Sequence, residues 1–221
     1  MRRKYDPPLC CVAGMPRSGT TWLTRMLADA FNVPSLSRIK EWDNKKTAVI
    51  DPVIYGLERK GKAVRRGHWE AWNYPYLDSP VVVIVRDIRD QAISSYHYYE
   101  QTDLDAHARW LVGTHGEKWR NYVFGWVFYG APFVRYEDLH SSTYHVLKST
   151  IQSLGLKQPD DDHLKQVVKE HTFSRMMRGD KAHKLMRRGK VGDWKREMRP
   201  KTAAHLETVC KDVMEHLHYD E

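Results

Sequence analysis

Apolar residues occur along the chain either in short unbroken runs or at helical spacing. The runs predict buried strands at Leu9–Ala13 and Val81–Val85, with shorter strands at Lys62–Arg65 and from Phe133. Helical spacing predicts helices from Thr20 to Phe31 and then over residues 89–99, 117–130, 143–154, 161–170 and 201–218. Strands that alternate with helices indicate an α/β fold, a three-layer sandwich with a central parallel sheet covered on both faces.

The segment between the first predicted strand and helix has the outline of a phosphate-binding loop, G-x-x-x-x-G, from Gly14 to Gly19. In nucleoside triphosphatases, Lys and then Ser or Thr follow the second glycine of this loop. Here Thr20 and Thr21 follow it, and the cation, Arg17, lies inside the loop. With neither that Lys nor a carboxylate pair, the sequence predicts a P-loop-like loop that works without a metal ion.

Polar or cationic residues follow every predicted strand. Besides the glycine loop, they are Arg66-Gly67-His68, Arg86-Asp87 and Tyr136-Glu137-Asp138. Ligands of open α/β sheets bind at the carboxyl ends of the strands. A single polar loop is often structural, but four that converge on one sheet edge favour a binding site there.

Length and composition indicate the number of domains, the cellular location and the charge of the expected partner. A chain of 221 residues predicts one domain over residues 1–221, and no apolar run reaches the roughly 18 residues that span a membrane. The basic N-terminus lacks an apolar signal region, and the three cysteines (Cys10, Cys11 and Cys210) show no disulfide or zinc spacing. We therefore expect a cytoplasmic protein. The net charge of +8 favours an anionic partner.

Four segments together resemble the cytosolic-type sulfotransferases. "GMPRSGTTWL" looks like their 5′-phosphosulfate loop, and "VVVIVRDIRDQAISSYHYY" resembles their 3′-phosphate motif. "FVRYEDL" resembles their adenine-side strand, and "RRGKVGDWK" (residues 187–195, here called the late loop) is similar to their R-K-G-x-x-G-D-W-K segment. The resemblance implies an enzyme that moves the sulfuryl group of 3′-phosphoadenosine-5′-phosphosulfate (PAPS) to a hydroxyl or amine and releases 3′-phosphoadenosine-5′-phosphate (PAP).

The resemblance implies roles for the glycine loop. Arg17 stands where the family usually has Lys, and we expect it to stabilise the charge that grows on the leaving phosphate oxygen. Because Arg cannot donate a proton as Lys can, a general-acid role at this position is doubtful. The other expected contacts to the phosphosulfate are Ser18, Gly19, Thr20 and Thr21. Helix capping is the alternative role of the hydroxyl residues.

The nucleotide's 3′-phosphate and adenine have their own expected ligands. By resemblance, the 3′-phosphate ligands are Arg86, Ser94, Arg187, Arg188 and Gly189. Trp22 and Phe173 are candidates to enclose the adenine, and Tyr136 to contact its edge. Packing in the core is the alternative role of these aromatic residues and of Ser94.

The acceptor must lose a proton, and the family's base is a His in a K-T-H-type motif after the second strand. The matching residues are Arg66 and His68, with Gly67 and Trp69 in place of the family's Thr and Leu. An imidazole suits proton removal near neutral pH. Glu41 or Asp43 is the fallback base, since some relatives use a carboxylate, and His97 is a weaker candidate.

The acceptor is expected to be a small molecule, and its pocket to be walled by residues 32–62 and 100–118, which contain Trp42, Tyr55 and Trp110. The chain is shorter than typical family members, so the pocket is either open or completed by a second subunit of a homodimer. Two other functions remain as alternatives. A P-loop kinase-like phosphotransferase would leave the Arg–Ser and R-R-G motifs unexplained. A nucleic-acid binder would explain the charge, but no nucleic-acid motif is present and we expect no such partner.

Overall fold

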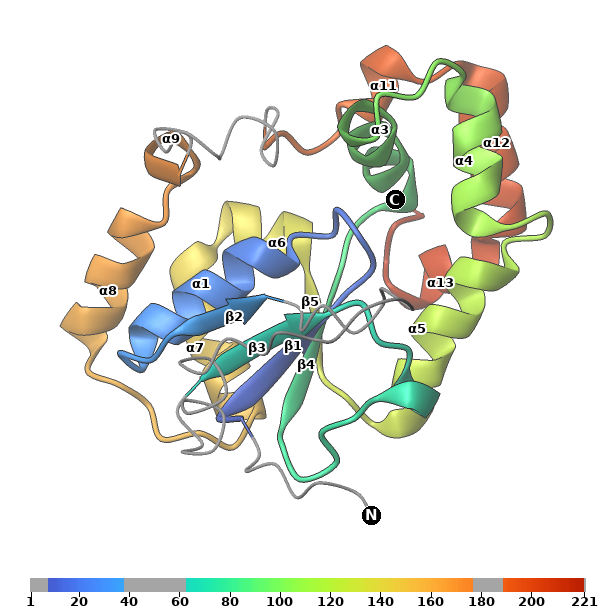
Figure 1. The fold of residues 1–221 in the computed structure, drawn as a ribbon. Coiled ribbons are helices and arrows are strands. Elements are labelled where there is room, and N and C mark those ends of the chain that lie inside the picture. The colour runs from blue at the N-terminus through green and yellow to red at the C-terminus, as the bar shows by residue number, and fades with distance from the viewer. Residues whose placement is uncertain (1–7, 38–62, 177–188, 221) are drawn as a thin grey trace, which may run out of the picture.

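The fold is built on a parallel sheet in the computed structural model, which describes residues 8–37, 63–176 and 189–220 (Figure 1). The strands are β1 (Cys10–Ala13), β2 (Ser35–Ser37), β3 (Val64–Gly67), β4 (Val81–Val85) and β5 (Phe133–Arg135). They form one sheet in the order β2-β3-β1-β4-β5, and every neighbouring pair is parallel. The predicted parallel sheet is confirmed, with one strand, β2, that the sequence pattern missed.

Side chains of the strands alternate between two separate cores. From β1 and β4, Cys11, Ala13 and Val83 pack into one core, whereas Val12 and Ile84 pack into the other. A strand buried on both faces reads as a continuous apolar run, as observed in the sequence. The three-layer architecture is therefore confirmed.

The core that contains Cys10 and Val12 lies under four helices. They are α1 (Thr20–Ala30), α6 (Tyr136–Ser141), α7 (Thr143–Ser153) and α8 (Asp161–Glu170). Helix α1 follows β1 directly and buries Leu23, Met26 and Leu27 against the sheet. Its position fixes the glycine loop at the carboxyl end of β1.

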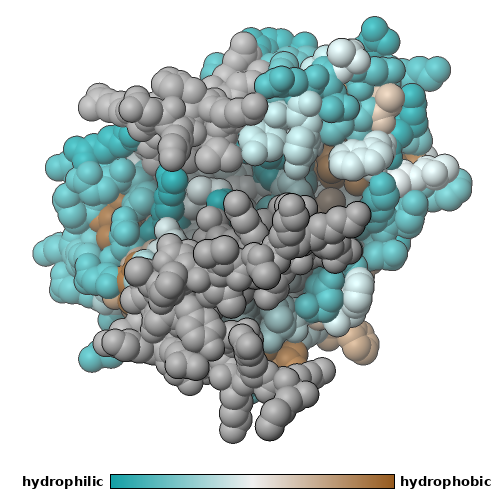
Figure 2. All heavy atoms as spheres, in the orientation of Figure 1, coloured by the Kyte–Doolittle hydropathy of each residue, from teal (hydrophilic) through white to brown (hydrophobic). Residues whose placement is uncertain are grey.

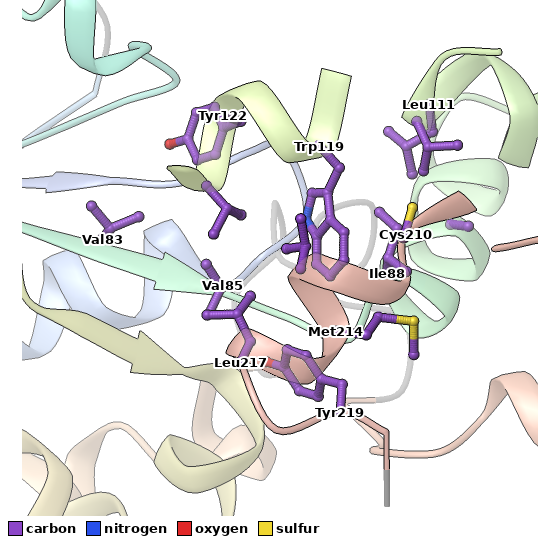
Figure 3. Close-up of a cluster of buried hydrophobic side chains, with 14 of the residues drawn as sticks. Val83, Val85, Ile88, Leu111, Trp119, Tyr122, Cys210, Met214, Leu217 and Tyr219 are labelled. Carbon is purple, nitrogen blue, oxygen red and sulfur yellow. The ribbon is translucent and has the colours of Figure 1, made fainter. Parts of the chain in front are cut away.

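The other core is covered by helices from the middle and the end of the chain. These are α3 (Ile88–Tyr98), α4 (Leu104–Val112), α5 (Glu117–Tyr129), α12 (Pro200–Val209) and α13 (Lys211–His216). Trp119 of α5 packs among Cys210, Met214 and Leu217 of the C-terminal segment (Figure 3). The C-terminal segment is thus packed into this core. The described part of the late loop, which precedes this segment in the chain, lies beside α3.

Several predicted bounds were wrong. The predicted strand at Lys62–Arg65 lies two residues later, as β3, and the predicted helix over 201–218 is two helices, α12 and α13. Short helices missed by the sequence pattern are η1 (Ala71–Asn73), α6, α9 (Phe173–Met176) and α11 (Trp194–Glu197). Within residues 100–118, expected as a pocket wall, the structure forms α4.

Hydrophobic side chains gather inside the molecule more than on its surface. On the face shown in Figure 2, most described residues are hydrophilic, and hydrophobic ones occupy small separate areas. Among the described helices, none combines the length and the apolar character needed to cross a membrane.

Candidate active site

The glycine loop depends on two glycines where the chain comes close to its neighbours. A Cβ at Gly14 would stand 2.5 Å from the Thr20 methyl carbon, 2.6 Å from Ser18 Oγ and 2.8 Å from the Ile84 carbonyl oxygen. Gly19 caps α1 with a φ of 102°, in the left-handed region, and a Cβ there would meet the Tyr136 ring at 2.7 Å. The loop is therefore tight enough that only glycine fits at both ends.

The hydroxyl residues of the loop have different environments. Ser18 is buried, and its Oγ donates to the Met15 carbonyl at 2.8 Å. Thr20 is also buried, whereas Thr21 Oγ1 accepts a hydrogen bond from Arg66 Nη1. Because Gly19 is the N-cap of α1 and no side chain caps the helix, the capping alternative for these residues is wrong. A ligand at the loop can therefore meet the N–H groups at the start of α1 without competition from a capping side chain.

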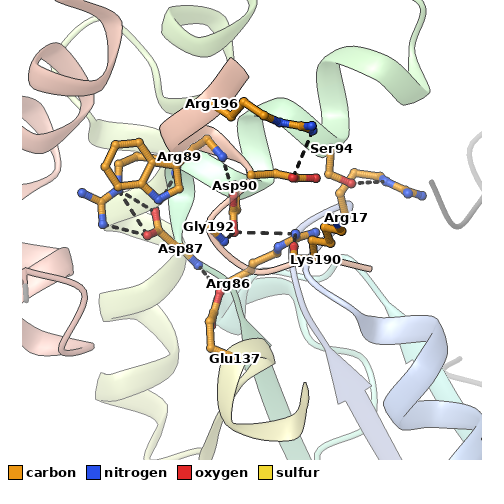
Figure 4. A network of polar contacts seen from close by, with 12 residues as sticks. Arg17, Arg86, Asp87, Arg89, Asp90, Ser94, Glu137, Lys190, Gly192 and Arg196 are labelled. Atoms are coloured by element: carbon orange, nitrogen blue, oxygen red, sulfur yellow. Dashed lines mark hydrogen bonds and ion pairs between the residues drawn. The ribbon is translucent and has the colours of Figure 1, made fainter. Parts of the chain in front are cut away.

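Arg17 lies in the loop with a φ of 72°, which is uncommon for a residue other than glycine. Its Nε donates to Ser94 Oγ of α3 at 3.2 Å, and its guanidinium carbon lies 4.5 Å from the centre of the Tyr98 ring. Figure 4 shows the bond between Arg17 and Ser94 across the two segments. Burial lowers the pKa of the Arg17 guanidinium, but arginine stays charged at physiological pH. The loop thus holds a fixed positive charge at a defined place.

His68 and Arg66 reach the same loop from the neighbouring strand. The register of β1 and β3 pairs Ala13 with Gly67, which brings His68 alongside Gly14. His68 Nδ1 lies 2.5 Å from the Gly14 carbonyl oxygen. A carbonyl oxygen only accepts, so Nδ1 carries the proton and Nε2 is the basic nitrogen of the ring. His68 is exposed, as a base that must meet an acceptor requires.

Gly67 and Trp69, the two departures from the family motif around His68, depend on each other. A Cβ at Gly67 would stand 2.5–2.6 Å from the Trp69 ring, so the large ring at 69 requires glycine at 67. Trp69 in turn contacts the rings of Tyr74 and Tyr76, and its carbonyl accepts a hydrogen bond from Trp126 Nε1 at 3.2 Å. The segment that carries His68 is thus anchored to an aromatic cluster.

Arg86 follows β4 and is buried among groups from three parts of the chain. Its Nη2 donates to the Lys190 carbonyl at 2.9 Å and lies 3.8 Å from Asp90 Oδ2. Its guanidinium carbon lies 4.4 Å from the centre of the Tyr136 ring. Arg86 Nε has no hydrogen-bond partner in the part of the chain that the structure describes. A buried donor of this kind is suited to an anionic ligand.

The described part of the late loop, from Gly189 onward, lies against α3, where Asp90 binds Gly192 and Trp194 (Figure 4). Gly189 has a φ of 61°, in the left-handed region, and Lys190 contacts Arg86 through its carbonyl. Arg187 and Arg188 lie outside the described residues, as do the fallback bases Glu41 and Asp43. The structure therefore brings Arg86 and Lys190 of the late loop together, while it places Ser94 beside Arg17.

Of the remaining predicted residues, Trp22 and Tyr136 lie together near the start of α1. Trp22 is buried, donates from Nε1 to the His171 carbonyl at 3.0 Å, and meets the Tyr136 ring edge-on at 5.8 Å between centres. Phe173 begins α9, and its side chain lies outside the described part. His97, the weaker candidate base, pairs through Nε2 with Glu197 Oε2 of α11 at 2.6 Å. His97 therefore contacts the end of α11, whereas His68 contacts the glycine loop.

The expected acceptor walls are only partly described. Trp42 and Tyr55 lie outside the described residues, and Trp110 on α4 is 61% exposed, with the Lys118 ammonium 5.2 Å from its ring centre. Trp110 thus faces largely outward.

Sequence reasoning missed three residues that shape the site: Asp90, Gln91 and Tyr98. Gln91 Nε2 donates to the Pro16 carbonyl at 2.9 Å and so ties the glycine loop to α3. Asp90 stands four residues after Arg86 on α3, a spacing that the sequence displays and that indicates an ion pair. Nothing in the sequence indicates the contacts of Gln91 or Tyr98, because both depend on how α3 packs against the loop.

The chain also matches a known family of enzymes. The model of the sulfotransferase domain matches residues 7–218, so the chain belongs to the sulfotransferase family, as the resemblance implied. It is a sulfotransferase of the PAPS-dependent kind. This membership decides against the phosphotransferase and nucleic-acid alternatives.

Individual relatives are distant in sequence. Sulfotransferase 2A1 of Rattus norvegicus is 26% identical over 238 residues, which cover 90% of this chain and 82% of the relative. Sulfotransferase 1C2 of Oryctolagus cuniculus is 23% identical, with 98% and 86% covered.

Solved structures show the same fold. Mouse sulfotransferase SULT7A1 complexed with PAP matches 93% of this chain and 84% of its own, with a TM-score of 0.73 and 20% identity. Retinol dehydratase in complex with androsterone and PAP matches 95% and 82%, with a TM-score of 0.68 and 17% identity.

Proposed function

We propose that this site moves the sulfuryl group of PAPS to a hydroxyl or amine of a small-molecule acceptor, with His68 as general base. The observation that carries the proposal is the contact between His68 Nδ1 and the Gly14 carbonyl. It sets a basic nitrogen directly beside the phosphate-binding loop, where acceptor and donor must meet.

The described residues fit such a donor. Gly14 leaves no room for a side chain beside Ser18 and Thr20, which keeps the glycine loop tight, and Arg86 has a buried Nε without a partner among the described residues. Arg17 and the N–H groups at the start of α1 would hold the 5′-phosphosulfate, and Arg86 with Gly189 the 3′-phosphate. The resemblance adds Ser94, Arg187 and Arg188 to the 3′-phosphate ligands. Structures similar in fold are complexed with PAP, which supports this nucleotide.

The reaction breaks one S–O bond and forms another S–O bond, or an S–N bond. His68 Nε2 takes the proton of the acceptor as its oxygen or nitrogen bonds to sulfur. The electron pair of the broken bond stays on the leaving phosphate oxygen, where Arg17 offsets its charge. Arg66, which bonds to Thr21, adds a second cation on the side of His68. No step requires a metal ion.

Three further inferences concern the class of acceptor, the extent of the domain and the cellular location. Retinol dehydratase was solved with retinol or androsterone, which supports a small-molecule acceptor here. We infer a single domain over 1–221, supported by the family match to residues 7–218. We also infer a cytoplasmic location, supported by three free, buried cysteines.

Nucleotide discrimination tests the proposal. Thermal melting should rise by several degrees with adenosine 3′,5′-bisphosphate and little with an equal concentration of AMP. A hydrogen bond to a charged group contributes about 1.5–3 kcal/mol, so two such bonds to the 3′-phosphate correspond to about a hundredfold in affinity or more. Equal shifts with both nucleotides would refute the 3′-phosphate site.

A transfer assay then identifies the acceptor. The protein is incubated with radiolabelled sulfuryl donor and an extract of its source, and labelled products are separated. A heat-inactivated sample is the control. Labelled product in the active sample alone supports the proposal and supplies the acceptor for kinetics.

A further inference from the structure

Asp90, in the first turn of α3, uses both carboxylate oxygens on backbone N–H groups of the late-loop segment. Oδ2 accepts from Gly192 N at 2.6 Å, and Oδ1 accepts from Trp194 N at 3.0 Å (Figure 4). The two segments are about a hundred residues apart in sequence, and Asp90 is 1% exposed. A buried carboxylate that accepts two N–H bonds fixes the chain that donates them.

Further contacts to the same segment come from Arg86, just before α3, and from Arg89 and His97 of α3. Arg86 binds the Lys190 carbonyl, and His97 binds Glu197. The Arg89 guanidinium carbon lies 4.0 Å from the centre of the Trp194 ring. Of these groups, only Asp90 and Arg86 bind the backbone of the loop itself, so they set its path.

Asp90 and Arg86 also act on each other. Arg86 Nη2 lies 3.8 Å from Asp90 Oδ2, longer than the bond between that oxygen and Gly192 N–H. At that distance Arg86 and Asp90 form only a long ion pair, whereas the carboxylate oxygens bond directly to the loop. Arg86 therefore keeps donor capacity for an anionic ligand while it stays anchored to Lys190.

We propose that Asp90 is a positioning residue that makes the nucleotide site selective for a 3′-phosphate, because it holds Gly189 and Lys190 of the late loop against Arg86. This inference rests on the proposed function. Asp90 itself would not touch the nucleotide. Loss of its contacts would let the loop move away from Arg86, and the 3′-phosphate would lose its ligands from the loop while the rest of the nucleotide kept its own.

The Asp90→Asn variant tests this role. Asn has nearly the same size as Asp, but its side chain has only one acceptor oxygen, so it can accept only one of the two N–H bonds. Affinities for adenosine 3′,5′-bisphosphate and AMP are measured by calorimetry. Loss of one hydrogen bond to a charged group predicts bisphosphate affinity about tenfold weaker or more, with AMP affinity unchanged within a few-fold. Hydrogen exchange of the peptide over residues 189–198 should become faster in the variant.

A glycine pair supplies a second variant that leaves the core untouched. Gly192 has a φ of +79°, and a Cβ there would meet nothing within 4 Å, so Gly192→Ala strains the loop backbone alone. Gly155, after α7, has a φ of +67° and equally open surroundings, so Gly155→Ala is the matched control. Gly192→Ala should reduce the preference for the bisphosphate over AMP, and Gly155→Ala should not.

The outcomes separate the two proposals. If Asp90→Asn and Gly192→Ala keep the wild-type preference, or if exchange of residues 189–198 is unchanged in Asp90→Asn, the positioning role is refuted. Equal weakening of both nucleotides would also refute it, as the effect of a generally destabilised fold. If the wild-type protein binds both nucleotides equally, the proposed function fails, while the exchange measurement still reports whether Asp90 holds the loop.

Discussion

Replacement of His68 tests whether its imidazole removes the proton of the acceptor. His68 is exposed, and its Nδ1 donates a hydrogen bond to the Gly14 carbonyl. Loss of a general base typically lowers the rate about 10²–10⁴-fold. We therefore expect His68→Ala to lose nearly all turnover and to keep nucleotide affinity within a few-fold.

The effect on stability should be small by comparison. One hydrogen bond contributes about 0.5–1.5 kcal/mol net, and a domain of this size melts about 2–4 °C lower for each kcal/mol lost. A loss of a few degrees leaves the protein folded at assay temperature, so the loss of rate cannot be attributed to unfolding. Melting and turnover are measured on the same samples.

His68→Asn separates the base from the support of Gly14. Its side-chain amide can donate to the Gly14 carbonyl as Nδ1 does, but it cannot take a proton from the acceptor. We expect His68→Asn to be as inactive as His68→Ala. His145→Ala, which removes an exposed histidine of α7, is the matched control and should keep wild-type turnover.

Two results would refute this reasoning. If His68→Asn restored most of the turnover, the role of His68 would be to hold the loop. If both variants retained near-normal turnover, the base would have to be Glu41, Asp43 or His97.

Three further predictions address the metal, the loop and a buried carboxylate. Turnover should survive excess EDTA, because Thr20 and Thr21 stand where a kinase loop has Lys and Ser or Thr; loss with EDTA that magnesium restores would revive the kinase hypothesis. Gly14→Ala should destabilise the fold by about 1–3 kcal/mol and abolish the nucleotide-induced rise in melting temperature, since its Cβ would stand 2.8 Å from a backbone oxygen. A wild-type rise in melting temperature with the nucleotide would contradict the tight packing of the loop. Burial raises the pKa of Glu137, so the folded protein binds this proton more tightly than the unfolded chain, and stability from this group falls as pH rises above its ordinary value of 4.5. Glu137→Gln lacks this component, so the melting temperature of the wild type minus that of the variant should decrease with rising pH, and an increase would contradict the assignment.

Local sequence patterns determined the elements that carry strong local signals. The five β-branched residues of Val81–Val85 predicted β4, and the glycine loop with the apolar spacing after it predicted the junction of β1 and α1. The ordered motifs also identified the sulfotransferase family, since each consists of neighbouring residues in the chain. These features could be predicted because their physical cause lies within a few residues.

Elements that depend on distant neighbours escaped the sequence. Strand β2 has the polar sequence Ser-Leu-Ser and exists because β3 offers it a partner at the edge of the sheet. The predicted C-terminal helix is interrupted after Val209, where Arg120 Nη2 of α5 donates to the Val209 carbonyl at 3.2 Å. Neither feature has a signal within its own segment.

In the site, the sequence indicated which residues take part but not which groups they contact. The sequence identified Arg17, Ser94 and His68 as candidates, but not that Ser94 bonds to Arg17 or that His68 bonds to the Gly14 carbonyl. It did not indicate the hold of Asp90 on the late loop. Side-chain type is encoded locally, whereas each of these partners comes from a different strand, helix or loop, so only the packing of α3 and β3 around the glycine loop decides which groups meet.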